Sequence, residues 1–442
     1  MGNKVALHNL GCKVNAYEIE AMQQLLEEAG YEIVPFEPGA DIYVINTCTV
    51  TNIADRKSRQ MLHKAKKMNP EAIVVATGCY VQTGGEKLEK DEAIDLVLGN
   101  NQKINIVEAL AEYAENKPGH GSHVIKINQT KEYEELSIDH TAEHVRAYIK
   151  VQDGCNQFCT YCIIPYARGR VRSRNIESVL KEVRALAEKG YKEVVLTGIH
   201  LSSYGADFPE EKKETLLSLI RAVHEIEGIR RIRLGSLEPG IVTREFAEGI
   251  AALPKVCPHF HLSLQSGCDE TLERMNRRYR SEEYRERCEL LREVYGNPAL
   301  TTDVIVGFPQ ESEEEFRKSY DFVDSIRFYE THIFKYSRRQ GTKAAAMDGQ
   351  LTEAEKSFRS EKMIELHHRH AGDYEKSMLG KNLEVLIEEE YTKDGRTWYL
   401  GHSREYIKTA VPKSEAYGVN DIVIVKAEGF LEEHIMTGEA VE

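Results

Sequence analysis

The chain has 442 residues, 41% of them hydrophobic, and a formal net charge of −14. This length is enough for about three domains. It contains no run of about 18 apolar residues, so we expect no transmembrane helix and no membrane partner. The first twelve residues lack the apolar run of a signal peptide, which favours a cytoplasmic protein. The negative charge argues against indiscriminate nucleic-acid binding but leaves room for local basic patches.

Residues 1–120 alternate between strand-like and helix-like segments, which predicts a doubly wound parallel sheet. Cys12, Cys48 and Cys79 each follow directly after one of the predicted strands. Because the carboxyl ends of parallel strands share one edge, where ligands bind, we expect these three thiols to meet in one site. The predicted strands are Lys4–Leu10, Tyr31–Val34, Asp41–Asn46 and Ala72–Ala76, and the helices are Tyr17–Glu28 and Ile53–Met68.

Residues 121–143 are polar and are expected to form a linker to a second α/β domain at 144–350. Six βα-type units there predict a partial (βα)6 barrel, whose active site belongs at the carboxyl ends of its strands. Cys155, Cys159 and Cys162 begin just after the first of these strands. The six predicted strands are Arg146–Val151, Glu193–Thr197, Arg230–Leu234, Phe260–Leu264, Thr302–Val306 and His332–Tyr336.

The remaining residues divide into a helix and a small β domain. Thr352 and Glu355 form a capping-box pattern, which predicts a polar connecting helix over 351–378. Residues 379–442 predict a small antiparallel β barrel. Its expected strands are Leu383–Glu388, Trp398–Gly401, Ile407–Val411 and Asp421–Ala427. Three histidines at 367, 368 and 370 fall on the connecting helix, where a polar face is favoured over metal ligands.

The chain has nine cysteines, and in a cytosolic protein of this size they point to metal binding or catalysis. The C-x3-C-x2-C cluster offers three ligands with no fourth nearby, whereas structural zinc usually takes four. Iron–sulfur clusters are held by cysteine thiolates, and three protein ligands leave one iron open. A zinc site or three packing cysteines are the alternatives. Cys257, Cys268 and Cys288 lack ligand spacing and are predicted to be structural.

The segment Cys155–Cys162 resembles the signature of the radical S-adenosylmethionine superfamily, in which the open iron binds the amino and carboxylate groups of S-adenosylmethionine. The chain as a whole resembles the radical S-adenosylmethionine methylthiotransferases, which add a second open cluster and a C-terminal TRAM domain, an RNA-binding β barrel. The segments that carry this wider resemblance are Gly11–Asn15, Asn46–Cys48, Thr77–Cys79, Ile164–Arg170, Ser236–Pro239, Leu264–Gly267, Thr302–Pro309 and Tyr336–Thr342.

This resemblance implies two [4Fe-4S] clusters, one on each group of three cysteines, with S-adenosylmethionine as the second cofactor. One S-adenosylmethionine donates a methyl group to a sulfur, and another yields the radical that removes hydrogen from C2 of a modified adenine in tRNA. Such an aromatic C–H has no acidic proton, so cofactor radical chemistry is required. A reductant, such as a flavodoxin or ferredoxin, and a sulfur source are implied partners. Candidate S-adenosylmethionine contacts at strand ends are Gly198, Ser236, Glu238, Gln265 and Ile305.

Two segments bear on the substrate. Gly11–Asn15 and Thr197–Leu201 resemble the branch that acts on N6-threonylcarbamoyladenosine in tRNA. The alternatives are the same chemistry on isopentenyl-adenosine tRNA or on a ribosomal-protein aspartate, and a non-catalytic iron–sulfur protein that binds RNA or senses redox state. One departure from the family pattern is Gln310, where glycine is more usual, although the following Glu311 is kept.

Basic residues near both cysteine groups are candidate RNA contacts. Residues 53–69 carry six Lys/Arg against one Asp. Basic patches suit phosphate binding, and alternate residues of an extended segment project to one face. Ordinary solvated charge is the alternative. The candidates are Arg56, Lys57 and Arg59 in this segment, Arg168, Arg170, Arg172 and Arg174 after the second cysteine group, and a further group at Arg274, Arg277, Arg278 and Arg280.

Overall fold

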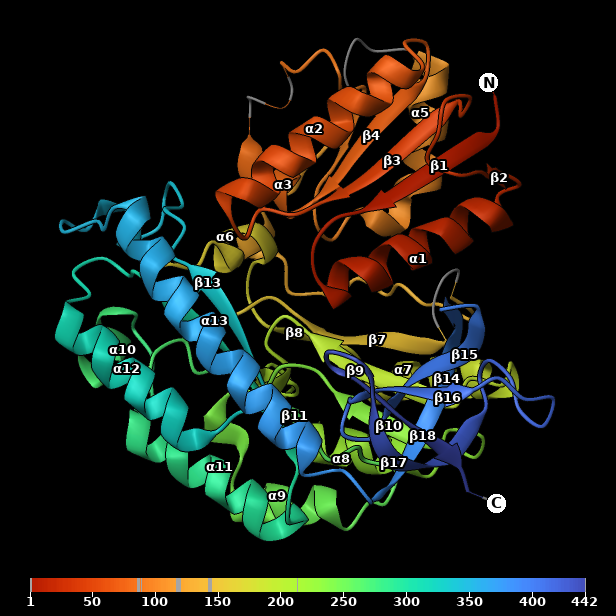
Figure 1. Ribbon diagram of the computed structural model, residues 1–442. Coiled ribbons are helices and arrows are strands. Elements are labelled where there is room, and N and C mark those ends of the chain that lie inside the picture. Colours follow the sequence, from red (N-terminus) through yellow and green to blue (C-terminus); the bar gives the residue numbers. More distant parts are fainter. Residues whose placement is uncertain are drawn as a thin grey trace.

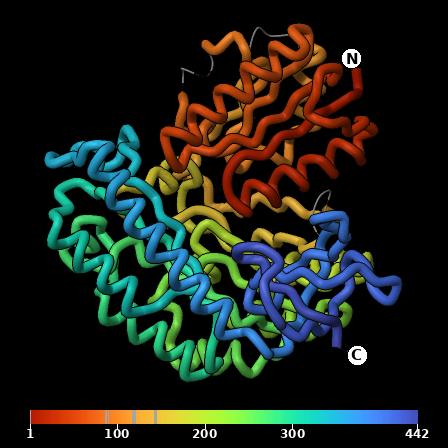
Figure 2. The backbone as a smooth tube through the Cα atoms, in the orientation of Figure 1, coloured from red at the N-terminus to blue at the C-terminus, as the bar shows by residue number. Residues whose placement is uncertain are grey.

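The structure is a computed structural model that describes residues 2–85, 88, 90–116, 121–141, 145–212 and 214–441. It has three parts: a parallel α/β sheet, an open barrel of parallel strands, and a small closed β barrel at the C-terminal end (Figures 1 and 2). The predicted fold class is confirmed. Among the described helices, none is both long enough and apolar enough to cross a membrane.

The N-terminal sheet has the strand order β2-β1-β3-β4-β5-β6 and is parallel throughout. Its strands are β1 (Lys4–Asn9), β2 (Glu32–Ile33), β3 (Ile42–Thr47), β4 (Ile73–Gly78), β5 (Leu96–Leu98) and β6 (Gly121–His123). Its helices are α1 (Lys13–Glu28), α2 (Asn52–Met68), α3 (Cys79–Gly84) and α5 (Ile106–Asn116). The short edge strand β6 lies in the segment predicted to be a linker, because its Gly-Ser-His sequence carries no strand pattern.

Both faces of this sheet are buried, as a doubly wound sheet requires. Tyr43 and Val74 point to the face covered by α2, where they pack near Leu62. Neighbouring strand positions point the other way, toward α1 and α5, and there Val44 packs near Leu26. The alternation along β3 therefore explains why its run of apolar residues has no exposed member.

The central domain is a barrel of six parallel strands that stays open, as predicted. Sheets β10-β9-β7-β8 and β11-β12-β13 are connected by isolated parallel bridges, including Leu237↔Leu262. The six parallel strands are β7 (Arg146–Asp153), β9 (Glu193–Gly198), β10 (Arg231–Leu234), β11 (His259–His261), β12 (Ala299–Val306) and β13 (Glu330–Lys335). The two-residue strand β8 (Arg172–Ser173) pairs antiparallel to β7 at the edge. The helices are α6 (Ile164–Arg168), α7 (Ile176–Glu188), α8 (Leu216–His224), α9 (Arg244–Ala251), α10 (Asp269–Arg274), α11 (Ser281–Tyr295) and α12 (Glu313–Ile326).

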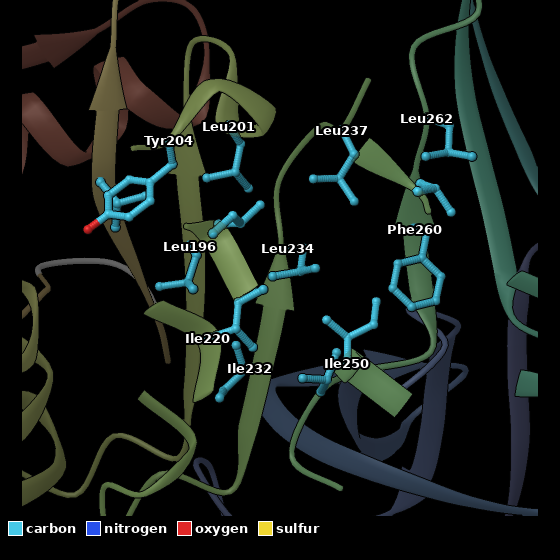
Figure 3. Close-up of a cluster of buried hydrophobic side chains, with 14 of the residues drawn as sticks. Leu196, Leu201, Tyr204, Ile220, Ile232, Leu234, Leu237, Ile250, Phe260 and Leu262 are labelled. Carbon is cyan, nitrogen blue, oxygen red and sulfur yellow. The ribbon is translucent and has the colours of Figure 1, made fainter. Parts of the chain in front are cut away.

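Helices pack on the outside of these strands through one continuous apolar core. Figure 3 shows Leu196 and Ile232, from neighbouring strands, beside Ile220 of α8, with Ile250 of α9 on the other side of β10. This core holds the strands in place from outside, so their carboxyl ends are free to carry loops and functional side chains.

Helix α13 (Glu353–Lys376) connects to the C-terminal domain and has the predicted capping box at Thr352 and Glu355. The C-terminal barrel closes in the order β14-β15-β16-β18-β17, and only the β16–β18 pair is parallel. Its strands are β14 (Asn382–Lys393), β15 (Arg396–Ser403), β16 (Lys408–Pro412), β17 (Ile422–Glu432) and β18 (Ile435–Ala440). The predicted strands are present, and β18 adds a fifth.

Two buried arginines at the start of β10 attach the C-terminal barrel to the central one. Arg231 Nε lies 2.8 Å from Glu384 Oε1, and Arg233 Nε lies 2.8 Å from Glu193 Oε1. Both guanidinium groups also donate to backbone carbonyls of residues 402–404. These arginines hold the pKa of Glu193 at about 2, against the opposing effect of burial. The contact lies at the amino ends of the strands, opposite the predicted site.

Candidate active site

The first cysteine group meets at one sheet edge, as predicted. Cys12 precedes α1, Cys48 follows β3, and Cys79 begins α3. Asn15 joins two of the loops, because its Nδ2 donates to Leu10 O at 2.7 Å and to Thr47 O at 3.0 Å. Cys12 is exposed, Cys48 is half-buried and Cys79 is buried, so the group runs from the surface inward.

The turn before Cys79 depends on Gly78. Its φ of +97° is in the left-handed region, and an added Cβ would lie 2.5 Å from both Asn46 Oδ1 and Thr47 O. Only glycine fits this position without strain. Burial raises the pKa of the Cys48 thiol to about 11, with Cys79 and Cys12 adding to the effect. A free thiol there is protonated at neutral pH, and a metal must displace that proton to bind.

Arg168 lies behind the first cysteine group and was predicted to contact RNA. Its side chain is fully buried. Its Nε lies 3.2 Å from Cys79 Sγ, one guanidinium nitrogen lies 2.7 Å from Glu18 Oε1, and the other lies 2.7 Å from Asn15 Oδ1. Arg168 is the last residue of α6, so its guanidinium group connects the N-terminal sheet to the central barrel. The RNA assignment is wrong for this residue.

The same is true of two neighbouring arginines. Arg172 is fully buried and lies 3.5 Å from Asp153 Oδ2, and Arg174 is 1% exposed and pairs with Glu182. Neither can reach an RNA phosphate. Arg170 alone of the four is exposed, with its guanidinium 4.6 Å from the ring centroid of Phe158. The expected alternation along an extended segment fails because this segment enters the interface between two domains.

Charge in this interface is unbalanced within the described residues. Six buried side chains are connected by ion pairs: the cations are Lys103, Lys150, Arg168 and Arg172, and the anions are Glu18 and Asp153. Four cations against two carboxylates leave a surplus of two positive charges. A buried surplus is costly unless an anion compensates it. Metal-bound thiolates beside Arg168 would supply that negative charge, so the surroundings fit a thiolate-bound metal group.

The second cysteine group lies in the loop after β7. Burial raises the pKa of Cys155 to about 11 and that of Cys162 to about 12. The segment after α10 clamps this loop: Thr160 N donates to Met275 O at 3.0 Å, and Asn276 Nδ2 donates to Phe158 O at 3.1 Å. Phe158 has a left-handed φ of +52°, which the clamp maintains.

Arg277 is a site residue that the sequence assigned to RNA. One guanidinium nitrogen lies 3.3 Å from Cys159 Sγ, and the other lies 2.6 Å and 2.8 Å from the two carboxylate oxygens of Glu238. This arrangement orients Glu238 beside the second cysteine group. Arg274 is likewise paired, at 2.7 Å from Glu315 Oε1, whereas Arg278 and Arg280 are exposed. The local sequence does not show that Arg274 and Arg277 are ion-paired while Arg278 and Arg280 are exposed.

The predicted S-adenosylmethionine contacts lie at strand ends around this loop. An added Cβ at Gly198 would lie 2.9 Å from Gln152 Cβ, so the glycine permits close packing of β9 on β7. Ser236 is exposed, and Gln265 is buried. Ile305 is half-buried, and its N donates to Gln265 O at 2.8 Å. The groove beside the loop is lined by Gln157, His200, Ser202, Glu238, Gly240 and Phe246, so Glu238 is the one predicted contact that faces it.

Three polar residues on adjacent barrel strands escaped the sequence prediction. His261 of β11, Asp303 of β12 and His332 of β13 have ligand atoms within 4.8 Å of one another. His261 alternates with the outward-facing Phe260 and Leu262 and therefore faces the barrel interior, and Asp303 is in register with His332 on the same side. Each lies on a different strand, and only the barrel brings them together.

The basic helix α2 begins beside the first cysteine group. Cys48 N donates to Ser58 Oγ at 3.2 Å, and Ser58 is one of the few buried residues of α2. Arg56, Lys57 and Arg59 are exposed, as an RNA-binding face requires. The loop at 336–342 reaches this helix from the barrel, with an Arg339 guanidinium nitrogen 2.7 Å from Asp55 Oδ2.

Both cysteine groups fit iron–sulfur clusters better than single ions. All nine cysteines are free thiols, and Cys257, Cys268 and Cys288 are buried apart from both groups. Neither group of three brings all its sulfur atoms within 4.8 Å of one another. A single tetrahedral zinc with bonds of about 2.3 Å needs sulfur atoms about 4 Å apart. The wider spacing suits a cluster, and three ligands leave one iron open.

Comparisons with known proteins agree with this geometry. Residues 149–323 match the radical SAM superfamily, and residues 4–99 match an uncharacterized protein family, UPF0004. The structure resembles that of TsrM, a radical S-adenosylmethionine methyltransferase from Kitasatospora setae, with a TM-score of 0.58 and 18% identity over 78% of this chain and 77% of that one. This likeness concerns the fold.

Two relatives are similar over nearly the whole chain. The threonylcarbamoyladenosine tRNA methylthiotransferase MtaB of Bacillus subtilis is 41% identical, with 96% of this chain and 93% of the relative covered. The protein of the same name from Aquifex aeolicus is 44% identical, with 88% and 93% covered. The chain therefore belongs to the radical S-adenosylmethionine methylthiotransferases, enzymes that use S-adenosylmethionine and two [4Fe-4S] clusters, in the branch of the threonylcarbamoyladenosine tRNA methylthiotransferases.

Proposed function

We propose that this enzyme adds a methylthio group to C2 of N6-threonylcarbamoyladenosine next to the anticodon of tRNA. The observation that carries the proposal is the pair of three-cysteine groups in one molecule, together with 41% and 44% identity to relatives named for this substrate. The conversion replaces an aromatic C–H that no side-chain base can deprotonate, so it needs cofactor chemistry.

Each group of cysteines has a distinct task in this proposal. Cys12, Cys48 and Cys79 hold one cluster, and Cys155, Cys159 and Cys162 hold the other. When bound, the clusters and S-adenosylmethionine supply a redox-active iron with an open position, a methyl group and a radical source. The protein binds and orients these groups and excludes water from the reactive species.

The side chains around the two cysteine groups orient the bound cofactors and shield them from water. Arg168 compensates thiolate charge at the first group, and Arg277 does so at the second while it holds Glu238 in the groove. Glu238 is placed to accept hydrogen bonds from the amino or ribose groups of S-adenosylmethionine. Gly198, Ser236, Gln265 and Ile305 stay proposed contacts on the same face. Burial lowers the pKa of His200, so its imidazole is neutral at physiological pH.

For tRNA, we propose contacts from Arg56, Lys57 and Arg59 on α2 and from Arg170 beside Phe158, all of which are exposed cations near a cysteine group. The C-terminal barrel after residue 379 serves as a TRAM-like second contact. A reductant such as a flavodoxin or ferredoxin and a sulfur source complete the reaction, and a cytoplasmic location follows from the tRNA substrate.

For the domain organisation, we propose boundaries at 144–350, 351–378 and 379–442, and we assign β6 to the first domain because it pairs with the N-terminal sheet.

The test uses enzyme reconstituted under anaerobic conditions with dithionite, S-adenosylmethionine and sulfide. Mass spectrometry of digested tRNA should show the 2-methylthio nucleoside when the tRNA carries N6-threonylcarbamoyladenosine. Isopentenyl-adenosine tRNA and the ribosomal-protein substrate, tested in parallel, should give no product. Product on either of these instead would keep the chemistry and overturn the substrate assignment. No product and no 5′-deoxyadenosine, with both clusters intact, would favour a non-catalytic iron–sulfur protein.

Two variants separate the cysteine groups in this assay. Cys159→Ala should abolish formation of 5′-deoxyadenosine, because it removes a ligand of the S-adenosylmethionine-cleaving cluster. Cys48→Ala should keep 5′-deoxyadenosine formation and lose the methylthio product. The matched control is Cys257→Ala, whose buried thiol lies in neither group. Equal loss in all three variants would contradict the assignment.

A further inference from the structure

A cluster of histidines lies where α13 meets the hairpin between β17 and β18, far along the chain from either cysteine group. Figure 1 shows α13 crossing the central barrel and leading into the C-terminal barrel. His368 is on α13, and Glu433 and His434 form the hairpin turn. His368 Nδ1 and His434 Nε2 lie 3.3 Å apart. The sequence predicted only a polar helix face here.

The spacing of these atoms matches the edge of a metal coordination shell. Two imidazole nitrogens bound to one tetrahedral zinc at about 2.0–2.1 Å lie about 3.3 Å apart. The Glu433 carboxylate supplies a third atom, with its Oε1 3.8 Å from His434 Nε2. All three ligand atoms lie within 4.8 Å of one another. One ion therefore fits between them without movement of the backbone.

The orientation of His434 also fits a ligand. Its Nδ1 lies 2.9 Å from Glu375 Oε1, and the side chain of Glu375 is only 3% exposed. If Nδ1 donates to this carboxylate, Nε2 keeps its lone pair toward His368. A carboxylate that orients a histidine in this way is the usual partner of metal-bound imidazole. Without an ion, two imidazole nitrogens face each other across 3.3 Å with one weak hydrogen bond.

The local charge favours a cation. Glu330 and Glu433 act on the buried Glu375 carboxylate, so three acidic groups share this region. His367 lies beside both other histidines, with its ring centroid 5.2 Å from that of His368 and 6.4 Å from that of His434. The Nδ1 of His367 accepts a hydrogen bond from Thr331 N of strand β13 at 3.3 Å. This nitrogen therefore contacts β13 and is not one of the ligand atoms of the ion.

We propose that His368, Glu433 and His434 bind one divalent transition-metal ion of the zinc class, with Glu375 as the group that orients His434. Two imidazoles and one carboxylate select this class over magnesium or calcium, which prefer oxygen ligands alone. Glu433 and His368 are exposed, so water can fill the fourth position. The ion would join α13 to the β17–β18 hairpin and fix the C-terminal barrel against the helix.

The test measures zinc binding by untagged enzyme with both iron–sulfur clusters assembled. Competition against a fluorescent zinc chelator should show one site in the wild-type protein that His368→Gln and His434→Gln each lose. Glu375→Gln should weaken that site by about 10- to 100-fold. Zinc should raise the Tm of the wild-type protein and leave the Tm of His368→Gln unchanged. Circular dichroism and iron content confirm that each variant is folded and loaded.

The matched control is His367→Gln, which changes the adjacent histidine of the same helix and should keep the zinc site. Equal zinc stoichiometry and affinity in wild type, His368→Gln and His434→Gln would overturn the proposal. Loss of zinc in His367→Gln as large as in His368→Gln would overturn the assigned ligand set. Neither result depends on tRNA or on turnover, so it is independent of the proposed function.

Discussion

At the scale of single residues, Arg168 makes the contact on which the first cysteine group depends. Its guanidinium group contacts Glu18, Asn15 and Cys79. We expect Arg168→Gln to lower the free energy of unfolding by about 3–5 kcal/mol, because it breaks a buried ion pair. It should also lose roughly half of the bound iron, because the first of the two clusters loses the guanidinium group that contacts Cys79. Urea denaturation and iron analysis measure both effects.

The control for this variant is Arg170→Gln, which removes an exposed cation from the same segment. It should leave stability and iron content near the wild-type values, because surface charges contribute little. If Arg168→Gln were as stable and as iron-rich as Arg170→Gln, the buried role of Arg168 would be contradicted.

Arg277 has a different consequence, because its guanidinium donates to Cys159 Sγ at 3.3 Å. Hydrogen bonds to cluster sulfur atoms raise the reduction potential. Arg277→Met should therefore lower the potential of the second cluster by roughly tens of millivolts, as followed by EPR during redox titration. The exposed neighbour gives the control, and Arg278→Met should leave the potential unchanged. A potential in Arg277→Met equal to that of the control would refute this role.

At the scale of elements, the turn from β4 into α3 depends on a glycine. Gly78→Ala combines left-handed strain with a clash against Asn46 and Thr47. We expect a loss of about 2 kcal/mol or more in unfolding free energy, together with loss of the first cluster. Gly190→Ala has a similar φ of +89° but open space around it, so strain alone should cost it about 1 kcal/mol. Equal urea midpoints for the two variants would contradict the clash.

Helix α2 is the element that we expect to contact the tRNA backbone. The triple variant Arg56→Gln, Lys57→Gln, Arg59→Gln should weaken tRNA binding and reduce the slope of log K against log salt by about 2–3. Filter binding over a salt series measures this slope. Lys318→Gln with Lys362→Gln removes exposed cations from α12 and α13 and should change the slope little. An unchanged slope in the triple variant would exclude α2 as a phosphate contact.

At the scale of the whole molecule, Glu193 connects two barrels through Arg231 and Arg233. Its pKa of about 2 lies below the ordinary value, so its carboxylate stabilises the fold above about pH 5. This contribution, about 3 kcal/mol, is lost as pH falls toward 2. Glu193→Gln should therefore be less stable near pH 7 and should lose less stability on acidification. Parallel slopes for the two proteins between pH 5 and pH 3 would contradict this.

The fold class and the convergence of Cys12, Cys48 and Cys79 at one sheet edge could be predicted from the sequence alone. Strand and helix periodicity is encoded within a few residues, and Cys12, Cys48 and Cys79 directly follow strands whose ends must share an edge. The same local reasoning missed the three-residue strands β5 and β6 and the closing strand β18, because such strands take their structure from a partner rather than from their own pattern.

Tertiary contacts assign individual charged side chains to the site or to the surface. Arg168 and Arg170 are two residues apart, yet one is buried against Glu18, 150 positions earlier, while the other faces solvent. His368 and His434 likewise meet across 66 residues. From sequence alone, a charged side chain is expected to be exposed, because burying it costs free energy. Only oppositely charged or hydrogen-bonding side chains from distant parts of the chain can offset this cost, and only folding brings them close.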